Sequence, residues 1–169
     1  TEESGRKYRE LLFTAPGIGE YISGVIMYDE TIRQRASDGH TFVTVLEKQG
    51  VVPGIKVDMG TESFNDSDVE KYTKGLDGLD ERLKEYYNFG ARFAKWRATY
   101  SVTDDLPSDE LINKNAEDLA EYAFLCQQNN MVPIVEPEVL MDGSRTIERS
   151  YVVTKKVLQV TFEKLVSRG

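Results

Sequence analysis

Three short segments of the chain carry pairs of charged residues where a strand pattern predicts burial. The pairs are Lys56 and Asp58, Lys95 and Arg97, and Glu136 and Glu138. Side chains two residues apart on a strand point to the same face, so each pair shares a face. A lone buried charge is very costly, so such charges persist as a mutually compensated cluster or as a polar pocket. The three pairs therefore predict a site that binds anions and moves protons.

Lys95 and Arg97 put two positive charges on one expected strand face. Such cations repel unless anions lie close, and an Arg fork beside a Lys point charge suits phosphate. Cationic neighbours also favour the neutral, nucleophilic form of a lysine, so the pattern alone makes Lys95 the best imine-forming candidate here. Trp96 lies between them and is expected to point the opposite way and pack under a helix.

Glu136 and Glu138 lie on either side of Pro137, which fixes the backbone at the expected strand end. A carboxylate beside several cations can pair with them or serve as a general acid or base. Lys56 and Asp58 also allow a simpler interpretation, an ion pair in a polar layer of the fold, because structural networks often hold such charges. The residues alone leave both interpretations open.

Helical and strand patterns alternate along the chain, and their order predicts the scaffold that holds these charges. Strands are expected at 21–28, 51–58, 92–100 and 132–136, and helices at 1–13, 42–49, 77–89, 108–128 and 147–166. Four strand-then-helix units imply parallel strands with right-handed crossovers. A doubly wound sheet and a TIM (β/α)8 barrel both fit, and the barrel is favoured because the charges recur at the carboxyl ends of strands. Residues 1–169 are expected to form a single domain.

Local signals add detail to this scaffold. The run 21–28 is almost entirely apolar, which predicts a strand covered on both faces. The stretch 60–73 is polar and predicts a loop. Asp77 and Ser108 are expected to cap the helices that follow them.

Composition excludes several classes of protein. The 169 residues carry a net charge of −8, which argues against a nucleic-acid binder and against binding to an anionic membrane surface. No apolar run approaches the roughly 20 residues that membrane insertion needs. The single cysteine, Cys126, is expected in the core and fits a reducing compartment, so we expect a cytoplasmic location. One His and one Cys do not suit a His/Cys zinc site, and no metal or other cofactor is expected.

Five stretches of the chain together resemble the class I fructose-1,6-bisphosphate aldolases. They are GIKVD at 54–58, KGLDGLDER at 74–82, GARFAKWR at 90–97, LCQQNNMVPIVEPE at 125–138 and TKKVL at 154–158. The resemblance implies a TIM barrel of which this chain supplies roughly the second to fifth β/α units, in a homotetramer. It also implies reversible cleavage of fructose 1,6-bisphosphate into dihydroxyacetone phosphate and glyceraldehyde 3-phosphate through a lysine imine, without a metal.

The resemblance implies a catalytic role for three residues. Lys95 would lie beside the imine and assist proton transfer and carbon–carbon cleavage. Glu136 would be the acid/base that helps to form and dehydrate the carbinolamine. Asp58 would orient Lys95.

Binding of the sugar would fall to the other charged residues. By resemblance, Lys56 and Arg97 would hold the phosphate and hydroxyl end of the substrate together with Lys95, and Glu138 would sit behind Glu136 as its charge partner. Met59 stands where the family usually has a lysine, and we expect little effect from this difference.

The family also has parts that these residues do not include. The resemblance places a first strand before Thr1 and the imine-forming lysine after Gly169, so we expect the 169 residues alone to be inactive. The alternative function is an inactive aldolase-like scaffold. The partners implied are a phosphorylated sugar and, by family resemblance only, cytoskeletal proteins or adhesin tails.

Overall fold

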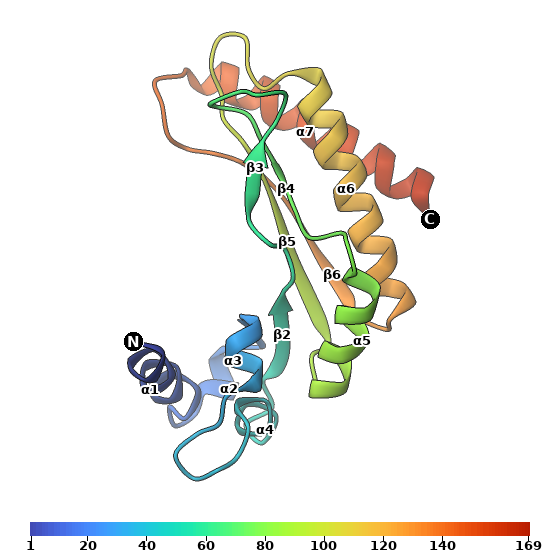
Figure 1. Cartoon of the computed structure of the whole chain (residues 1–169). Helices are drawn as coiled ribbons and strands as arrows, with labels where there is room; N and C mark the ends of the chain where they lie inside the picture. The colour runs from blue at the N-terminus through green and yellow to red at the C-terminus, as the bar shows by residue number, and fades with distance from the viewer.

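A four-stranded parallel sheet forms the centre of the computed structural model, which describes residues 1–169 (Figure 1). Its spatial order is β1 (Gly24–Met27), β2 (Val52–Lys56), β5 (Phe93–Tyr100) and β6 (Val132–Val139). All three neighbouring pairs are parallel, as the alternation of strands and helices predicts. Strands β1 and β6 are the two edges of this sheet.

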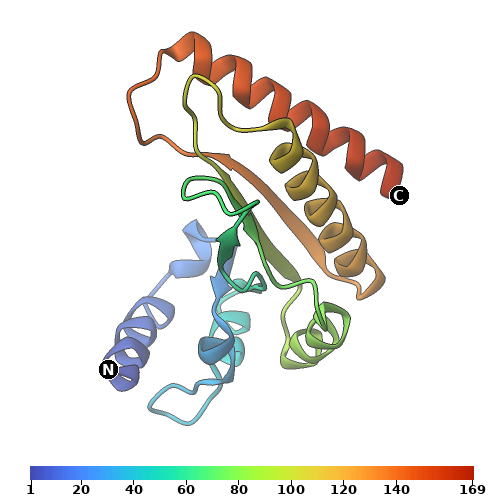
Figure 2. The ribbon, with the colours of Figure 1, turned by 45° about the horizontal axis from the view of Figure 1, so that its top comes forward.

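The helices cover one face of the sheet. Helices α6 (Asp109–Gln128) and α7 (Ile147–Arg168) lie side by side over β5 and β6 in both ribbon views (Figures 1 and 2). At the other edge, α3 (Asp29–Arg33) and α4 (Phe42–Glu47) pack on β2, and α5 (Leu79–Phe89) packs against α6. We call the helix-covered face the outer face and the opposite one the inner face.

Strand β5 shows how the sequence divides these two faces. Ala94, Trp96, Ala98 and Tyr100 are completely buried on the outer face, whereas the alternate residues on the inner face retain exposure. The Trp96 ring lies 5.5 Å from that of Tyr122 on α6. The predicted outward packing of Trp96 is therefore confirmed, because a strand alternates its side chains between faces.

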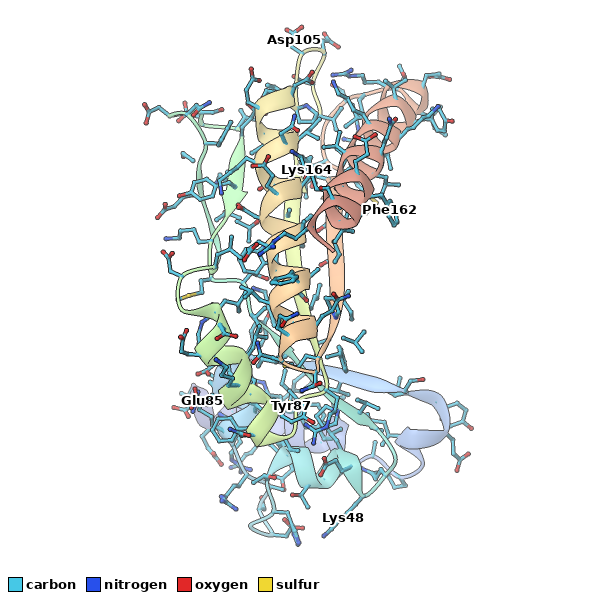
Figure 3. All side chains as sticks on the ribbon, turned by 90° about the vertical axis from the view of Figure 1, so that its right-hand side faces the viewer. Lys48, Glu85, Tyr87, Asp105, Phe162 and Lys164 are labelled. Atoms are coloured by element: carbon cyan, nitrogen blue, oxygen red, sulfur yellow. The ribbon has the colours of Figure 1, made fainter.

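Helices α6 and α7 are joined by a regular set of ion pairs. In each pair the two residues are 47 positions apart, so the helices run parallel in a constant register. The pairs are Asp109–Lys156, Glu117–Lys164 and Glu121–Arg168. Figure 3 places Lys164 where the two helices meet. No helix of the chain is both long and apolar enough to cross a membrane.

The structure corrects the loop expected at 60–73. Strands β3 (Thr61–Ser63) and β4 (Lys71–Thr73) form an antiparallel hairpin, with Glu62 opposite Tyr72. The Tyr72 hydroxyl donates a 2.8 Å hydrogen bond to Glu62. All three residues of β3 are exposed, so the hairpin has no apolar periodicity that could reveal it in the sequence.

The strand expected at 21–28 is also wrong in extent and in burial. Tyr21 ends the short helix α2 (Ile18–Tyr21) and is 83% exposed, so β1 holds only the four residues from Gly24 to Met27. Ile26 lies on the inner face and is 41% exposed, whereas Met27 is buried under the helices. Strand β1 is thus covered on one face within this chain.

The expected helix caps are correct at one site and wrong at another. The Ser108 hydroxyl accepts a hydrogen bond from Leu111 N at the start of α6, as predicted. Asp77 does not cap α5, whose N-cap is Gly78 in a left-handed conformation at φ 64°. At the N-terminus, Thr1 and Ser4 cap α1 (Glu2–Phe13) with reciprocal hydrogen bonds.

Candidate active site

The six charged residues gather on the inner face at the carboxyl ends of β2, β5 and β6. Lys95 Nζ lies 2.8 Å from Glu136 Oε2, which confirms their expected proximity. The other contacts are an Arg97 Nη1–Glu138 Oε2 pair at 3.1 Å and a pair between Lys56 and Asp58. Three cations face three carboxylates, so the cluster is electrically balanced, as charges removed from water require.

Sheet register explains why these side chains meet. Lys56 and Lys95 stand directly opposite each other on β2 and β5, and Arg97 stands opposite Glu136 on β6. Two lysines at neighbouring positions repel each other, and each therefore needs its own carboxylate. Asp58 and Glu136 provide these carboxylates.

Two carboxylate oxygens in the cluster are buried and accept no hydrogen bond from the protein. They are Oδ2 of Asp58 and Oε2 of Glu136. Although Glu136 Oε2 is close to Lys95 Nζ, the contact is an ion pair without hydrogen-bond geometry. An unsatisfied buried acceptor is costly and occurs where a ligand or a transferred proton can satisfy it. Both atoms therefore have an acceptor position that no group of this chain fills.

Two of the expected partners differ from the observed ones. Asp58 pairs with Lys56 and makes no hydrogen bond or ion pair with Lys95, which it was expected to orient. Glu138 was expected to be the charge partner of Glu136, but it forms an ion pair with Arg97 instead. The cause is position. Asp58 lies two residues beyond Lys56 on the same face, and Glu138 lies two residues beyond the level of Arg97 on the neighbouring strand, so each carboxylate meets that cation first.

A hollow of about 310 Å³ adjoins the cluster. Its lining includes Lys56, Lys95 and Arg97 together with Ile26, Met27 and Tyr28 from β1 and its end. Tyr28 is 58% exposed, and sequence reasoning missed it because the apolar run around it indicates only a strand. The inner face thus offers an aromatic hydroxyl beside three cations. The structure gathers no group of three or more His, Cys, Asp or Glu side chains that could hold a metal.

The opposite end of the inner face is apolar, and we call it the apolar floor. It surrounds a second hollow of about 540 Å³, whose lining includes Ile26, Val52, Phe93, Val132 and Ile134. A Cβ added to Gly54 would overlap the Phe93 ring, and one added to Gly24 would lie 3.0 Å from it. The Phe93 ring therefore occupies space left by Gly54 on the adjacent β2 and by Gly24 on β1. Arg92 is the one charged residue that lines this hollow, whereas the charged cluster lies at the carboxyl end, the position of the active site in TIM barrels.

Side chains behind the sheet hold the main chain beside the charged residues. Thr73 Oγ1 donates to the carbonyl of Arg97 at 2.8 Å, and Tyr122 OH donates to that of Ile134 at 3.3 Å. Arg82 Nη1 donates to the carbonyl of Val57 at 2.9 Å. Sequence reasoning missed these three donors. Only Arg82 left a signal, as the last residue of the KGLDGLDER stretch.

Comparison with known proteins gives the same assignment over the whole chain. The family model described as "Glycolytic: Fructose-bisphosphate aldolase class-I" matches residues 1–169. A probable class 1 fructose-bisphosphate aldolase of Xanthomonas campestris is 52% identical over 169 residues, which are all of this chain and 51% of that protein. Cytosolic fructose-bisphosphate aldolase 4 of Arabidopsis thaliana is 50% identical over 97% of this chain and 42% of its own length.

A solved structure is similar over almost the same residues. Fructose-bisphosphate aldolase from Plasmodium falciparum, in complex with TRAP and a small-molecule inhibitor, superimposes with a TM-score of 0.94 at 48% identity. The match covers 97% of this chain and 48% of that one. The chain thus spans about half the length of the curated relatives it matches. It belongs to the glycolytic class I fructose-bisphosphate aldolase family.

Proposed function

We propose that this chain, together with the remainder of the family's TIM barrel, cleaves fructose 1,6-bisphosphate reversibly into dihydroxyacetone phosphate and glyceraldehyde 3-phosphate through a lysine imine. The main support is the 2.8 Å contact between Lys95 Nζ and Glu136 Oε2 at the carboxyl end of the sheet. The contact places a positive charge beside a carboxylate that can donate and accept protons. Imine chemistry requires protons to be delivered and removed repeatedly at one place.

Glu136 acts as the proton donor and acceptor in this proposal. Forming the imine requires the carbinolamine to lose its hydroxyl as water, and a protonated Glu136 supplies the proton. The side chain is 34% exposed and contacts Lys95, which lines the hollow. Lys95 stays protonated and places positive charge beside the reacting carbon atoms. Cleavage then moves the carbon–carbon electron pair into the iminium, and Glu136, ionised once it has protonated the departing water, takes the proton of the adjacent hydroxyl as the aldehyde forms.

Lys56 and Arg97 are proposed to hold the phosphate and hydroxyl end of the sugar, with Lys95 between them. Both are paired with carboxylates in the structure, Lys56 with Asp58 and Arg97 with Glu138. A phosphate dianion would displace a singly charged carboxylate, and 49% of the Arg97 side chain is exposed to receive it. The proposal therefore includes an exchange of partners at Arg97 on binding.

The apolar floor and α7 bear on assembly. We propose that further strands of the barrel pair with the edges β1 and β6 and cover the floor.

We also propose the family's homotetramer. Its support is an exposed apolar stripe on α7, where Tyr151, Phe162 and Val166 are each more than 60% exposed. Figure 3 places Phe162 on the side of α7 away from α6. Phe162→Glu would give a smaller assembly by light scattering, whereas an unchanged mass would place the interface elsewhere.

Binding of other proteins is a second proposed function, with a cytoplasmic location. The Plasmodium falciparum relative was solved in complex with TRAP, and two Arabidopsis thaliana relatives are described as cytosolic. A scaffold without catalysis has no separate support, because the charged pairs of the site are intact. Partner binding is therefore proposed alongside turnover.

Borohydride trapping tests the aldolase proposal. The complete protein is incubated with dihydroxyacetone phosphate, reduced with borohydride and mapped by peptide mass spectrometry, in parallel with an assay of fructose 1,6-bisphosphate cleavage. We expect cleavage and one covalent adduct on a lysine outside residues 1–169. An adduct on Lys95 would overturn its role as a neighbour of the imine. Absence of both cleavage and adduct would overturn the aldolase proposal and leave the scaffold.

A further inference from the structure

We propose that Arg82 is a positioning residue that fixes the carboxyl end of β2 and thereby aims Lys56 at the substrate phosphate. This inference rests on the proposed function, because it assigns Arg82 a part in binding through Lys56. Arg82 lies on α5, behind the sheet, so it has no access to the inner face except through the main chain of β2.

Both hydrogen bonds that Arg82 donates in the structure go to main-chain carbonyls, and its guanidinium also lies near the Tyr86 hydroxyl and the Asp29 carboxylate. Nη1 donates to the carbonyl of Val57 at 2.9 Å, and Nη2 donates to the carbonyl of Gly75. Val57 is the residue between Lys56 and Asp58, so its peptide group sets the direction of both side chains. Arg82 belongs to none of the ion pairs of the chain, so its guanidinium is not there to neutralise a carboxylate within 4 Å. Its fork instead joins a strand end to a loop.

Arg82 binds β2 at the residue where the hydrogen bonds between β2 and β5 end. The last bond between β2 and β5 runs from Val57 N to Lys95 O at 3.1 Å. Beyond it the chain leaves the sheet, and Met59 N donates to Lys74 O in the loop at 2.8 Å. The carbonyl of Val57 is thus held from outside the sheet. A charged donor makes a stronger hydrogen bond there than a neutral one.

At Gly75 the loop that precedes α5 packs tightly against the carboxyl end of β2. The Gly75 φ of +128° is unfavourable for other residues, and a Cβ there would lie 3.1 Å from Met59 N and 3.2 Å from both Val57 O and the Trp96 ring. The loop at Gly75, the end of β2 and the Trp96 ring therefore lie in contact, and Arg82 joins the loop to the strand by its two hydrogen bonds. Loss of the guanidinium frees the Val57 peptide to rotate and moves Lys56 relative to Lys95 and Arg97.

The test compares Arg82→Lys with Arg92→Lys in the complete protein. Arg92 also donates to two main-chain carbonyls, those of Tyr87 at 3.0 Å and Ala91 at 2.9 Å, but at the amino end of β5. The measurements are the Kd of the non-cleavable hexitol 1,6-bisphosphate by calorimetry, kcat and KM for fructose 1,6-bisphosphate, and the thermal midpoint. We expect Arg82→Lys to weaken binding and raise KM roughly ten- to a hundredfold, in line with the cost of misplacing a binding group. Arg92→Lys should leave both unchanged.

Further measurements separate positioning from simple loss of stability. Guanidinium ion added to Arg82→Ala should restore part of the bisphosphate affinity, whereas a structural role alone predicts no rescue. Reductive ¹³C-methylation reports the resonance of Lys56, assigned with Lys56→Arg, and this resonance should shift in Arg82→Lys but not in Arg92→Lys. If Arg82→Lys does not fold, Arg82→Gln, which keeps one donor, takes its place.

The two proposals fail in different ways. Wild-type protein that neither binds the hexitol bisphosphate nor cleaves the sugar refutes the proposed function. Active wild-type protein with unchanged Kd, KM and Lys56 resonance in the Arg82 variant overturns the role of Arg82 alone.

Discussion

Lys95 and Glu136 pair diagonally across β5 and β6, because the residue directly opposite Lys95 is Ile134 and the one opposite Glu136 is Arg97. Arg97 repeats the same offset with Glu138, which stands opposite Thr99. Lys95 and Arg97 thus each pair with the carboxylate two residues farther along the neighbouring strand, whereas Lys56 pairs with Asp58 of its own segment. Glu136 thus contacts Lys95 and stands opposite a second cation, Arg97, in the sheet.

This placement predicts different effects for two matched substitutions. Glu136→Gln keeps the shape of the side chain and loses proton transfer, so kcat should fall about 10²–10⁴-fold with little change in KM. Glu138→Gln loses the partner of Arg97 and should change mainly KM. Steady-state kinetics on the complete protein measure both. An unchanged kcat with a raised KM in Glu136→Gln would show that Glu136 only positions the substrate.

Stability should depend on pH through Glu10 on α1. Hydrogen bonds from Ser37 N at 2.6 Å and then from Arg6 lower the pKa of the Glu10 carboxyl. A lowered pKa stabilises the fold above the ordinary value of about 4.3, and this contribution disappears as pH falls through the lowered pKa. Glu10→Gln should therefore be less stable than wild type at pH 7, and the difference should vanish at low pH.

Urea unfolding measures this difference, with the single buried Trp96 as fluorescent probe. Glu20→Gln is the matched control, since the exposed Glu20 makes no hydrogen bond or ion pair. A Glu10 effect of the same size at both pH values would mean that the carboxylate charge does not contribute.

The alternation of the sequence was sufficient to predict the parallel sheet and the meeting of Lys95 with Glu136. Both follow from local periodicity, because strand side chains alternate and parallel strands end at one edge. The β3–β4 hairpin was missed for the opposite reason. The residues of β3 are polar and exposed, and β4 has a single buried residue, Thr73. Cross-strand bonds such as Tyr72 to Glu62 join the two strands without an apolar pattern.

Contacts between elements distant in sequence account for the rest. The bond from Arg82 to Val57 joins residues 25 positions apart and depends on the turn at Gly75. Such a contact is set by tertiary geometry, which residue type and spacing do not encode. The pairing of Asp58 with Lys56 is different, because the two residues are near in sequence and their ion pair was one of the two interpretations that the sequence left open.

Cys126 should be unreactive in the folded protein. The residue is fully buried on α6, and burial raises the pKa of its thiol to about 12. The thiolate is the reactive form, and at pH 8 roughly one thiol in ten thousand would be ionised. Labelling with a thiol reagent should be slow in native protein and rapid in denaturant. Rapid native labelling would show that α6 opens readily.

The last prediction concerns the apolar floor, where Gly54 and Phe93 lie on neighbouring strands. A Cβ on Gly54 would overlap the Phe93 ring, so Gly54→Ala forces the ring aside and should destabilise the protein by about 1–3 kcal/mol. Gly5→Ala is the control. Gly5 lies inside α1, and its new Cβ would meet only the flexible side chain of Arg9. The same substitution should stabilise there by about 0.5–1 kcal/mol.

A double-mutant cycle identifies the cause at Gly54. Phe93→Leu removes the ring from the space that a Cβ would take, so Gly54→Ala should cost less in that background than in wild type. Chemical unfolding of the four proteins gives the coupling energy, which should be about 0.5–3 kcal/mol for residues in direct contact. Additive effects would mean that Gly54→Ala acts through the backbone of β2 and that the ring plays no part.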